Sequence, residues 1–462
     1  METDPVGAPP PDGPGRDTGV PGAVVRDPLW GPIGLDGTAR RVVDSAAFQR
    51  LRYIRQLGLA HLVYPGASHT RFDHALGVYH LIRRAIAGLA ARGGLDAVDP
   101  VERRLVPLAG LLHDVGHYPF SHALEELDEP LIPGHHEALT GRFLRDPDVR
   151  AAIESVASDG VARVESLIRG RSASPLQGLV SGSLDLDKVE YLKRDARFCG
   201  VPYGEVDVDR LLNGLMVLTP PEGGRPEVGV HEKGVAALES LLFAKYQMFR
   251  NVYWHHAVRA GTVLYKRIVF DALAAGLIEA DELVGKTDEA LLFLLAERAG
   301  SGAGGERKEA ARRVAAMVEA LHRRELPKRA AEVVAAELDA EPAPWTGSDG
   351  ALKRAVEDRL ADELDLPAGA VFLDYPEKPG MFRLDLLVQR RTGEMLRLEP
   401  GGRAGLIGLP GVADELYRTA RVLRLFTLGG RRMVDAGAVA RLVALPDAEI
   451  RARLDAGTPL LG

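Results

Sequence analysis

The chain has 462 residues, of which 46% are hydrophobic and 27% charged, the balance of a globular protein with two or three domains. Its formal net charge of −7 argues against general binding to nucleic acid, so we expect no sequence-specific nucleic-acid partner. The single cysteine, Cys199, excludes an intramolecular disulfide and a thiolate zinc cluster, and no apolar run reaches the roughly 20 residues that span a bilayer, so we expect a cytoplasmic protein with no membrane partner.

The first predicted helix carries a histidine near its N-terminus. Residues 1–23, which precede it, alternate Pro and Gly with small polar residues, and we expect them to form a disordered arm. Thr70 and Asp73 have the spacing of a capping box, and apolar residues then recur at helical steps up to Gly93. This pattern predicts a helix with His74 in its first turn.

Three more helices are predicted next to polar residues. A cap and a first-turn proline at 99–100 begin a helix that closes at the pair His113 and Asp114. Another helix is predicted to start near His135, and a third covers 185–198. One face of this third helix, at positions i, i+4 and i+8, carries Asp187, Tyr191 and Asp195.

Beyond residue 212 the pattern becomes mixed, with turn-forming residues between short apolar segments. The predicted elements are a hairpin at 216–219 and 227–230, helices over 235–277, a Gly-rich loop at 299–305, amphipathic helices to about residue 338, a Pro- and Gly-rich boundary at 342–350, strands at 371–375 and 382–390, and a helix at 412–425.

Four residues in the first half have the chemistry of a catalytic metal site. Two imidazoles and two carboxylates suit a divalent ion and leave coordination positions open for water and substrate; they come from His74, His113, Asp114 and Asp187. Adjacent His and Asp side chains can converge at a helix end, where the geometry is irregular. Residue types alone leave a second interpretation open, in which the histidines are hydrogen-bonded core residues.

A second group of polar residues follows the His-Asp pair. It contains His117, His122, His135, His136 and Glu137. A solvated loop is one interpretation of this group, and it is the better one for His135. A functional role for His117 and His122 is an equal alternative on the residues alone.

Five ordered blocks carry a resemblance to a known family. They are 27–31 (DPLWG), 48–58 (FQRLRYIRQLG), 64–74 (YPGASHTRFDH), 112–122 (LHDVGHYPFSH) and 184–195 (LDLDKVEYLKRD). They resemble the HD-domain phosphohydrolases and, among these, the deoxynucleoside triphosphate (dNTP) triphosphohydrolases, which include dGTPases. The similarity covers about residues 25–270.

The resemblance implies roles for named residues. It implies one metal ion held by His74, His113, Asp114 and Asp187. It implies that His136, with Glu137 behind it, works at the scissile phosphoester and that His117 and His122 line the α-phosphate. Phosphate contacts are implied for Arg71 and Lys188, and deoxyribose contacts for Gln56, Tyr191 and Asp195, with Leu57 beside the sugar.

These roles predict hydrolysis of dNTPs to deoxynucleoside and inorganic triphosphate. A bound divalent ion lowers the pKa of its water towards about 7, and this water would attack the α-phosphorus. His136 would donate a proton to the leaving 5′ oxygen. Two alternatives are open: an HD phosphomonoesterase or phosphodiesterase acting on another nucleotide, and a non-catalytic nucleotide-binding regulatory protein.

The predicted architecture is mainly α, an HD-domain helical fold with small β-hairpin elements and a smaller mixed α+β C-terminal region. The expected divisions are the arm 1–23, an HD phosphohydrolase domain 24–280, a helical extension 281–345 and the mixed region 346–462. The expected cofactor is one divalent ion, with Fe, Mn, Zn, Co and Mg all compatible, and Mg is expected to accompany the nucleotide. The family also implies a homo-oligomer, a dimer or a tetramer.

Overall fold

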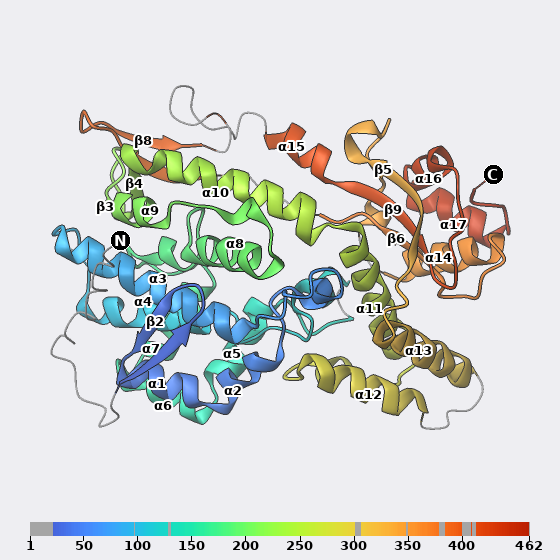
Figure 1. The fold of residues 1–462 in the computed structure, drawn as a ribbon, viewed down its shortest axis with the longest axis horizontal. Helices are drawn as coiled ribbons and strands as arrows, with labels where there is room; N and C mark the ends of the chain where they lie inside the picture. Colours follow the sequence, from blue (N-terminus) through green and yellow to red (C-terminus); the bar gives the residue numbers. More distant parts are fainter. Residues whose placement is uncertain are drawn as a thin grey trace.

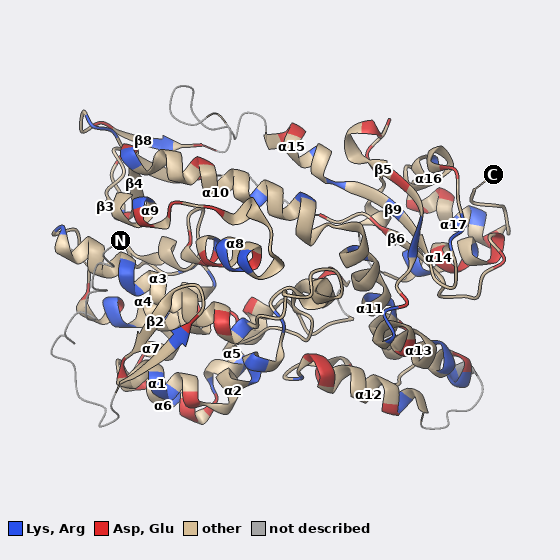
Figure 2. Ribbon diagram, viewed as in Figure 1, with Lys and Arg blue, Asp and Glu red and all other residues tan. Residues whose placement is uncertain are grey.

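The computed structural model is mainly helical, and the residues that it describes form three small sheets, which confirms the predicted fold class (Figure 1). It describes residues 22–96, 98–127, 131–300, 306–347, 350–377, 384–399, 408 and 413–461. Among these residues no helix is both long enough and apolar enough to cross a membrane. Acidic and basic residues are interspersed along the described helices (Figure 2).

The helices of the first half surround the predicted chemistry. They are α1 (Gly37–Asp44), α2 (Ala46–Gln49), α3 (Arg71–Ala91), α4 (Pro100–Leu112), α5 (His136–Leu144), α6 (Pro147–Glu154), α7 (Gly160–Ile168), α8 (Leu186–Cys199) and α9 (Val208–Gly214). The capping box of Thr70 and Asp73 is present at α3, Asp99 caps α4, and His135 is the N-cap residue of α5. The four helix boundaries predicted near polar residues are therefore confirmed to within a residue or two.

An N-terminal hairpin was not predicted. Residues 1–21 of the expected disordered arm lie outside the described residues, but Ala23 already begins strand β1 (Ala23–Asp27), which pairs antiparallel with β2 (Gly31–Leu35). The Asp27 carboxylate accepts hydrogen bonds from the backbone amides of Leu29 and Trp30 and so fixes the turn. Only five residues form each strand, too short a pattern for alternation to stand out.

The predicted hairpin at 216–230 is confirmed and belongs to a larger sheet. Strands β3 (Leu215–Leu218) and β4 (Glu227–His231) pair antiparallel, and β4 continues into the sheet order β3-β4-β7-β8. The added strands are β7 (Leu386–Gln389), within the predicted 382–390, and β8 (Met395–Leu398). This sheet joins two segments that are far apart in the sequence.

The rest of the second half consists of α10 (Val235–Met248), a π-helical turn (Phe249–Tyr253), α11 (His256–Ala274), α12 (Asp288–Gly300), α13 (Glu306–His322), α14 (Ala351–Glu363), α15 (Ala413–Ala420), α16 (Ala436–Val443) and α17 (Asp447–Asp455). Helix α11 lies between the first-half helices and a C-terminal sheet of order β5-β9-β6 (Figure 1). Its strands are β5 (Lys328–Val334), β6 (Val371–Asp374) and β9 (Val422–Thr427).

Two helix predictions in this half were wrong. Residues 328–334, expected to continue an amphipathic helix to about 338, form β5, and the helix expected at 412–425 ends at Ala420 and gives way to β9. These two segments pair with each other over Lys328 to Val334. Local composition favours a helix in both, but long-range pairing and burial override the weak local propensity. The predicted domain boundaries themselves stay a prediction.

One of the apolar cores lies directly behind the second histidine group. It combines Tyr118, Phe120 and Leu124, all nearly fully buried, with residues of α11, α12 and α13 and with Phe372 of β6. The segment that carries His117 and His122 therefore packs against the C-terminal half of the chain. The two halves share a core next to the candidate site.

Candidate active site

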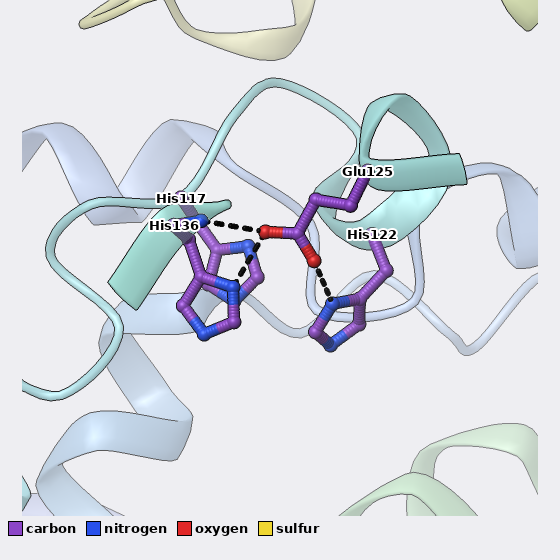
Figure 3. A group of neighbouring side chains, drawn as sticks. All are labelled: His117, His122, Glu125 and His136. Carbon is purple, nitrogen blue, oxygen red and sulfur yellow. Dashed lines mark hydrogen bonds and ion pairs between the residues drawn. The ribbon is translucent and has the colours of Figure 1, made fainter. Parts of the chain in front are cut away.

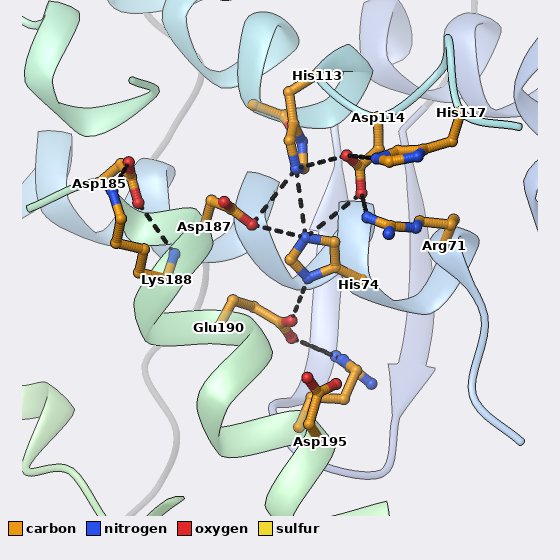
Figure 4. Close-up of polar contacts among 12 residues, drawn as sticks. Arg71, His74, His113, Asp114, His117, Asp185, Asp187, Lys188, Glu190 and Asp195 are labelled. Atoms are coloured by element: carbon orange, nitrogen blue, oxygen red, sulfur yellow. Dashed lines mark hydrogen bonds and ion pairs between the residues drawn. The ribbon is translucent and has the colours of Figure 1, made fainter. Parts of the chain in front are cut away.

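The four predicted metal-binding residues converge at helix ends (Figure 4). His74 lies in the first turn of α3, His113 is the C-cap residue of α4, Asp114 follows it, and Asp187 lies in the first turn of α8. The His74 Nε2 atom is 2.9 Å from Asp187 Oδ1, 3.3 Å from His113 Nε2 and 3.6 Å from Asp114 Oδ2. Residues from three separate helices thus present donor atoms to one point.

The orientation of the two imidazoles favours a metal ion at this point. The Nδ1 atom of His74 lies 2.6 Å from a Glu190 carboxylate oxygen, and that of His113 lies 2.8 Å from the Gly110 carbonyl oxygen. Both partners only accept hydrogen bonds, so each Nδ1 carries a proton and each Nε2 faces the point where the donor atoms meet. The two Nε2 atoms lie 3.3 Å apart, and both can bind a metal ion in place of a proton.

The charge at this point also calls for a cation. Burial alone lowers the pKa of His74, but the carboxylates of Asp187 and Glu190 outweigh it and raise the pKa to about 10. Burial alone raises the pKa of Asp187, yet His113 and His74 hold it well below its usual value. The carboxylates therefore remain charged and stabilise positive charge between them. The residues present fit one divalent ion.

Asp114 connects this site to the second histidine group. Its Oδ2 atom lies 2.5 Å from Arg71 Nη1, and its Oδ1 atom lies 3.3 Å from His113 Nε2 and 3.1 Å from His117 Nε2. The side chain is almost fully buried. Arg71, expected at a phosphate, donates its other hydrogen bond to Ser121 and so orients this carboxylate.

Glu190 was missed in the sequence. Besides His74 it accepts hydrogen bonds from Trp30 Nε1 at 2.8 Å and from Arg194 Nε at 2.7 Å, and Arg194 in turn pairs with Asp27 of the hairpin. The carboxylate is fully buried. Glu190 follows Asp187 by three residues on α8, so the helical spacing could have identified it as the partner of a ligand histidine.

We expect Gly77→Ala to lower metal affinity by about 10- to 100-fold, the usual effect of disturbing a residue that orients a ligand. A Cβ atom at Gly77 would lie 2.0 Å from Glu190 Oε1, so the carboxylate would be displaced from His74. Metal titration of the apoprotein measures the change. The matched control is Gly88→Ala on the same helix, where the nearest heavy atom is the flexible end of Arg92 at 3.2 Å. Equal affinities for the two variants would contradict the role of Glu190.

The second group brings together three of the predicted histidines and one unpredicted acid (Figure 3). Glu125 lies 2.5 Å from His136 Nδ1 through Oε1 and 2.8 Å from His122 Nδ1 through Oε2. The His117 and His136 rings stack at 3.8 Å between centroids. Burial lowers the pKa of His136, but Glu125 outweighs it and the pKa is raised. Burial and Arg71 hold the pKa of His117 well below its usual value, so the two stacked imidazoles have pKa values that are shifted in opposite directions.

The acid behind His136 is Glu125, and the expectation for Glu137 needs correction. Glu137 is exposed in the first turn of α5, and the carboxylate that contacts the His136 imidazole is that of Glu125. Glu125 ends the 3₁₀ helix η3 (Ser121–Glu126). It follows His122 by three residues, a spacing that pairs side chains in a helical turn. His122 itself has a side chain that is 59% exposed.

The residues expected at the sugar lie along α8 and beside it. Asp195 is buried, and its two oxygens contact His69 Nε2 at 2.8 Å and the Tyr253 hydroxyl at 2.7 Å. The side-chain oxygen of Gln56 is buried and has no hydrogen-bond partner among the described residues. Leu57 and Tyr191 are half-buried at the edge of a different apolar core, which α3, α4 and α8 share.

Lys188, an expected phosphate contact, is held by residues other than the four converging donors. Its ammonium group lies 2.5 Å from an oxygen of Asp185, the N-cap residue of α8, and donates to the Gly182 carbonyl oxygen at 2.7 Å. Asp185 raises the pKa of Lys188 against the opposing effect of burial, so the side chain stays cationic one residue from Asp187.

Comparisons with known proteins agree with this geometry. Residues 71–175 match the HD domain, which takes in three of the four converging donors, and residues 206–401 match the HD associated region. The chain belongs to the HD-domain proteins. Similar proteins are an uncharacterized protein of Methanocaldococcus jannaschii, 34% identical over 59% of this chain and 54% of its own length, and a deoxynucleoside triphosphate triphosphohydrolase SAMHD1 homolog of Dictyostelium discoideum, 28% identical over 58% and 51%.

A solved structure of a hypothetical protein from Aquifex aeolicus covers more of this HD-domain chain. It is 27% identical, with a TM-score of 0.63 over 88% of this chain and 96% of its own. The chain spans about half the length of the curated relatives it matches. The fold and the family are thus established, and the resemblance to dNTP triphosphohydrolases is supported by a named relative.

Proposed function

We propose that this HD-domain protein hydrolyses dNTPs to deoxynucleoside and inorganic triphosphate in a metal-dependent reaction. The observation that carries the proposal is the pair of facing Nε2 atoms of His74 and His113, with Asp114 and Asp187 beside them. Asp114 is 3.1 Å from His117, so the metal-binding residues adjoin the histidine group that would meet the phosphate. The named relative supports the substrate class.

The proposed reaction breaks the bond between the α-phosphorus and the 5′ oxygen. A divalent ion held by His74, His113, Asp114 and Asp187 would supply a water activated near neutral pH and offset phosphate charge. His136 donates its Nε2 proton to the leaving 5′ oxygen, while Glu125 holds Nδ1 at 2.5 Å and maintains the imidazolium. His117 and His122 line the α-phosphate.

The remaining predicted residues bind charge and sugar. Arg71 contacts the metal-binding carboxylate of Asp114, and Lys188, which follows Asp187 in the sequence, contacts Asp185. Both keep positive charge near the site and so favour an anionic substrate. The unpartnered oxygen of Gln56 would accept a hydrogen bond from the 3′ hydroxyl, next to Asp195, with Leu57 against the ring. Tyr191 excludes a 2′ hydroxyl by its bulk. Mg²⁺ accompanies the triphosphate.

A nucleotide panel tests the proposal. The purified protein is incubated with each dNTP, each ribonucleotide, a deoxynucleoside monophosphate and a cyclic nucleotide, with Fe, Mn, Zn, Co or Mg supplied in turn. We expect triphosphate release from dNTPs and little hydrolysis of GTP compared with dGTP. Release of orthophosphate, or ring opening, would replace the proposal with a phosphomonoesterase or phosphodiesterase. Binding without turnover would replace it with a regulatory protein.

Assembly and location belong to the same proposal. We propose a homo-oligomer, a dimer or a tetramer, on the strength of the family resemblance. Light scattering of the purified protein would show a mass two or four times that of the chain, and a monomer at working concentration would refute it. The cytoplasmic location stays a prediction.

A further inference from the structure

A buried arginine joins the histidine group to the C-terminal sheet. Arg259 lies on α11 and is 5% exposed. One side of its guanidinium donates to Asp374 of β6, with Nη2 at 2.6 Å and Nε at 3.1 Å. The other side donates to both oxygens of Glu126, each at 2.8 Å. Lys266 lies two helical turns further along α11, and its Nζ atom is 2.6 Å from the same Glu126 carboxylate.

Glu126 is adjacent to the acid that orients His136. Glu125 and Glu126 end the short helix η3, and their carboxylates point to opposite partners: Glu125 to His122 and His136, Glu126 to Arg259. A 3₁₀ helix of six residues has few hydrogen bonds of its own to hold its shape. The direction of Glu125 therefore depends on what fixes its neighbour.

The segment before η3 is strained and is also held from the second half of the chain. Phe120 and Ser121 have φ of 56° and 59°, a left-handed conformation that costs free energy in residues with a Cβ atom. Asp288 at the start of α12 accepts the Phe120 amide at 2.6 Å, and the Tyr265 hydroxyl donates to the Pro119 carbonyl oxygen at 3.3 Å. Contacts outside the segment must offset this strain.

We propose that Asp374, Arg259 and Glu126 form a positioning chain through which the C-terminal sheet holds Glu125, and through it His136, in working geometry. None of the three reaches a metal-binding residue or the proposed phosphate position, so they are positioning residues. The proposal rests on the proposed function for its kinetic readout. It assigns the C-terminal sheet a part in the first-half active site, although the sheet contributes no residue to that site.

A second buried ion pair on the same helix provides a matched control. Arg267 lies two turns after Arg259 on α11 and contacts the fully buried Glu357 of α14 at 3.3 Å. Glu357 also accepts the amide of Leu373, the neighbour of Asp374 in β6, at 2.9 Å. This pair therefore docks the same sheet on the same helix, but it does not touch η3. If the variants act only by loosening the sheet from α11, changes in either pair should lower kcat. If they act through η3, only changes in the Asp374–Arg259–Glu126 contacts should lower kcat.

The test compares Asp374→Asn and Glu126→Gln with Glu357→Gln in the full chain. We expect both positioning variants to lose about 10- to 100-fold in kcat, the effect of a displacement of roughly 1 Å at a catalytic group. KM should change by less than about threefold and the metal content should stay at that of the wild type. Amide hydrogen exchange over 118–127 should rise in these two variants, and Glu357→Gln should match the wild type in kcat and in exchange of this segment.

The outcomes separate this inference from the proposed function. If the wild type hydrolyses no dNTP, the function fails and exchange of 118–127 alone decides the positioning chain. Unchanged exchange and kcat in Asp374→Asn would overturn the chain while leaving the function intact. Equal losses in Glu357→Gln would also overturn it, because they would assign the effect to docking of the sheet.

Discussion

Asp187→Ala will leave the protein without its metal ion and lower hydrolysis by more than about 100-fold. Asp187 Oδ1 lies 2.9 Å from His74 Nε2 and 3.5 Å from His113 Nε2, so its removal takes away a charged donor at the point where the three side chains meet. Disturbing an outer partner of a ligand costs about 10- to 100-fold, and loss of a ligand itself exceeds this. Elemental analysis of the purified variant measures the metal, and dNTP turnover measures the activity.

The control for this experiment is Asp209→Ala. Asp209 is also an aspartate in the first turn of a helix, α9, and its side chain is 73% exposed and pairs with Arg84. Its loss removes the same group from the surface, where an ion pair contributes no more than about 1 kcal/mol. A full complement of metal in Asp187→Ala would show that the carboxylate is no ligand.

His136→Ala will retain the metal but reduce kcat by about 100- to 10,000-fold, the contribution of a positioned general acid. His136 belongs to the group around Glu125, apart from the four converging donors, so its removal leaves those donors in place. The Glu125 carboxylate then loses one of its two imidazole partners, and His122 keeps the other. Elemental analysis and single-turnover rates measured on the same preparation separate metal loss from loss of catalysis.

His135→Ala is the matched control, because His135 is the preceding residue and is exposed. It should keep both metal and kcat. Turnover of His136→Ala equal to that of His135→Ala would remove the general-acid assignment, and loss of metal in His136→Ala would move this histidine into the metal site.

The helix boundaries of the first half could be predicted because local signals agree with tertiary structure there. Thr70 and Asp73 satisfy backbone amides at the start of α3, and Asp99 accepts the amide of Val101 at the start of α4, where Pro100 has no amide to satisfy. The strands β5 and β9 could not be predicted in this way, because they are stabilised by pairing with each other across about 90 residues of sequence. Lys328 pairs with Thr427 at one end and Val334 with Val422 at the other. The residues of each strand do not by themselves indicate which distant segment will pair with it.

The candidate site also contains residues that could be predicted from local sequence and residues that could not. His74, His113 and Asp187 were predicted because a metal site needs particular side chains and their helix-end positions are visible in the sequence. Glu125 was not distinguished from Glu137, because the turn between η3 and α5 decides which acid faces His136. The resemblance supplied His136 but gave no information on the chain folding that selects its partner.

Isotope labelling of the product tests the central claim most directly. Hydrolysis of a dNTP in water enriched in the heavy oxygen isotope should place one heavy oxygen in inorganic triphosphate and none in the deoxynucleoside, because attack at the α-phosphorus breaks the bond to the 5′ oxygen. Mass spectrometry of both products reads the result. Label in the deoxynucleoside, or in pyrophosphate or orthophosphate as the first product, would contradict water delivery to the α-phosphorus by the site at His74, His113, Asp114 and Asp187.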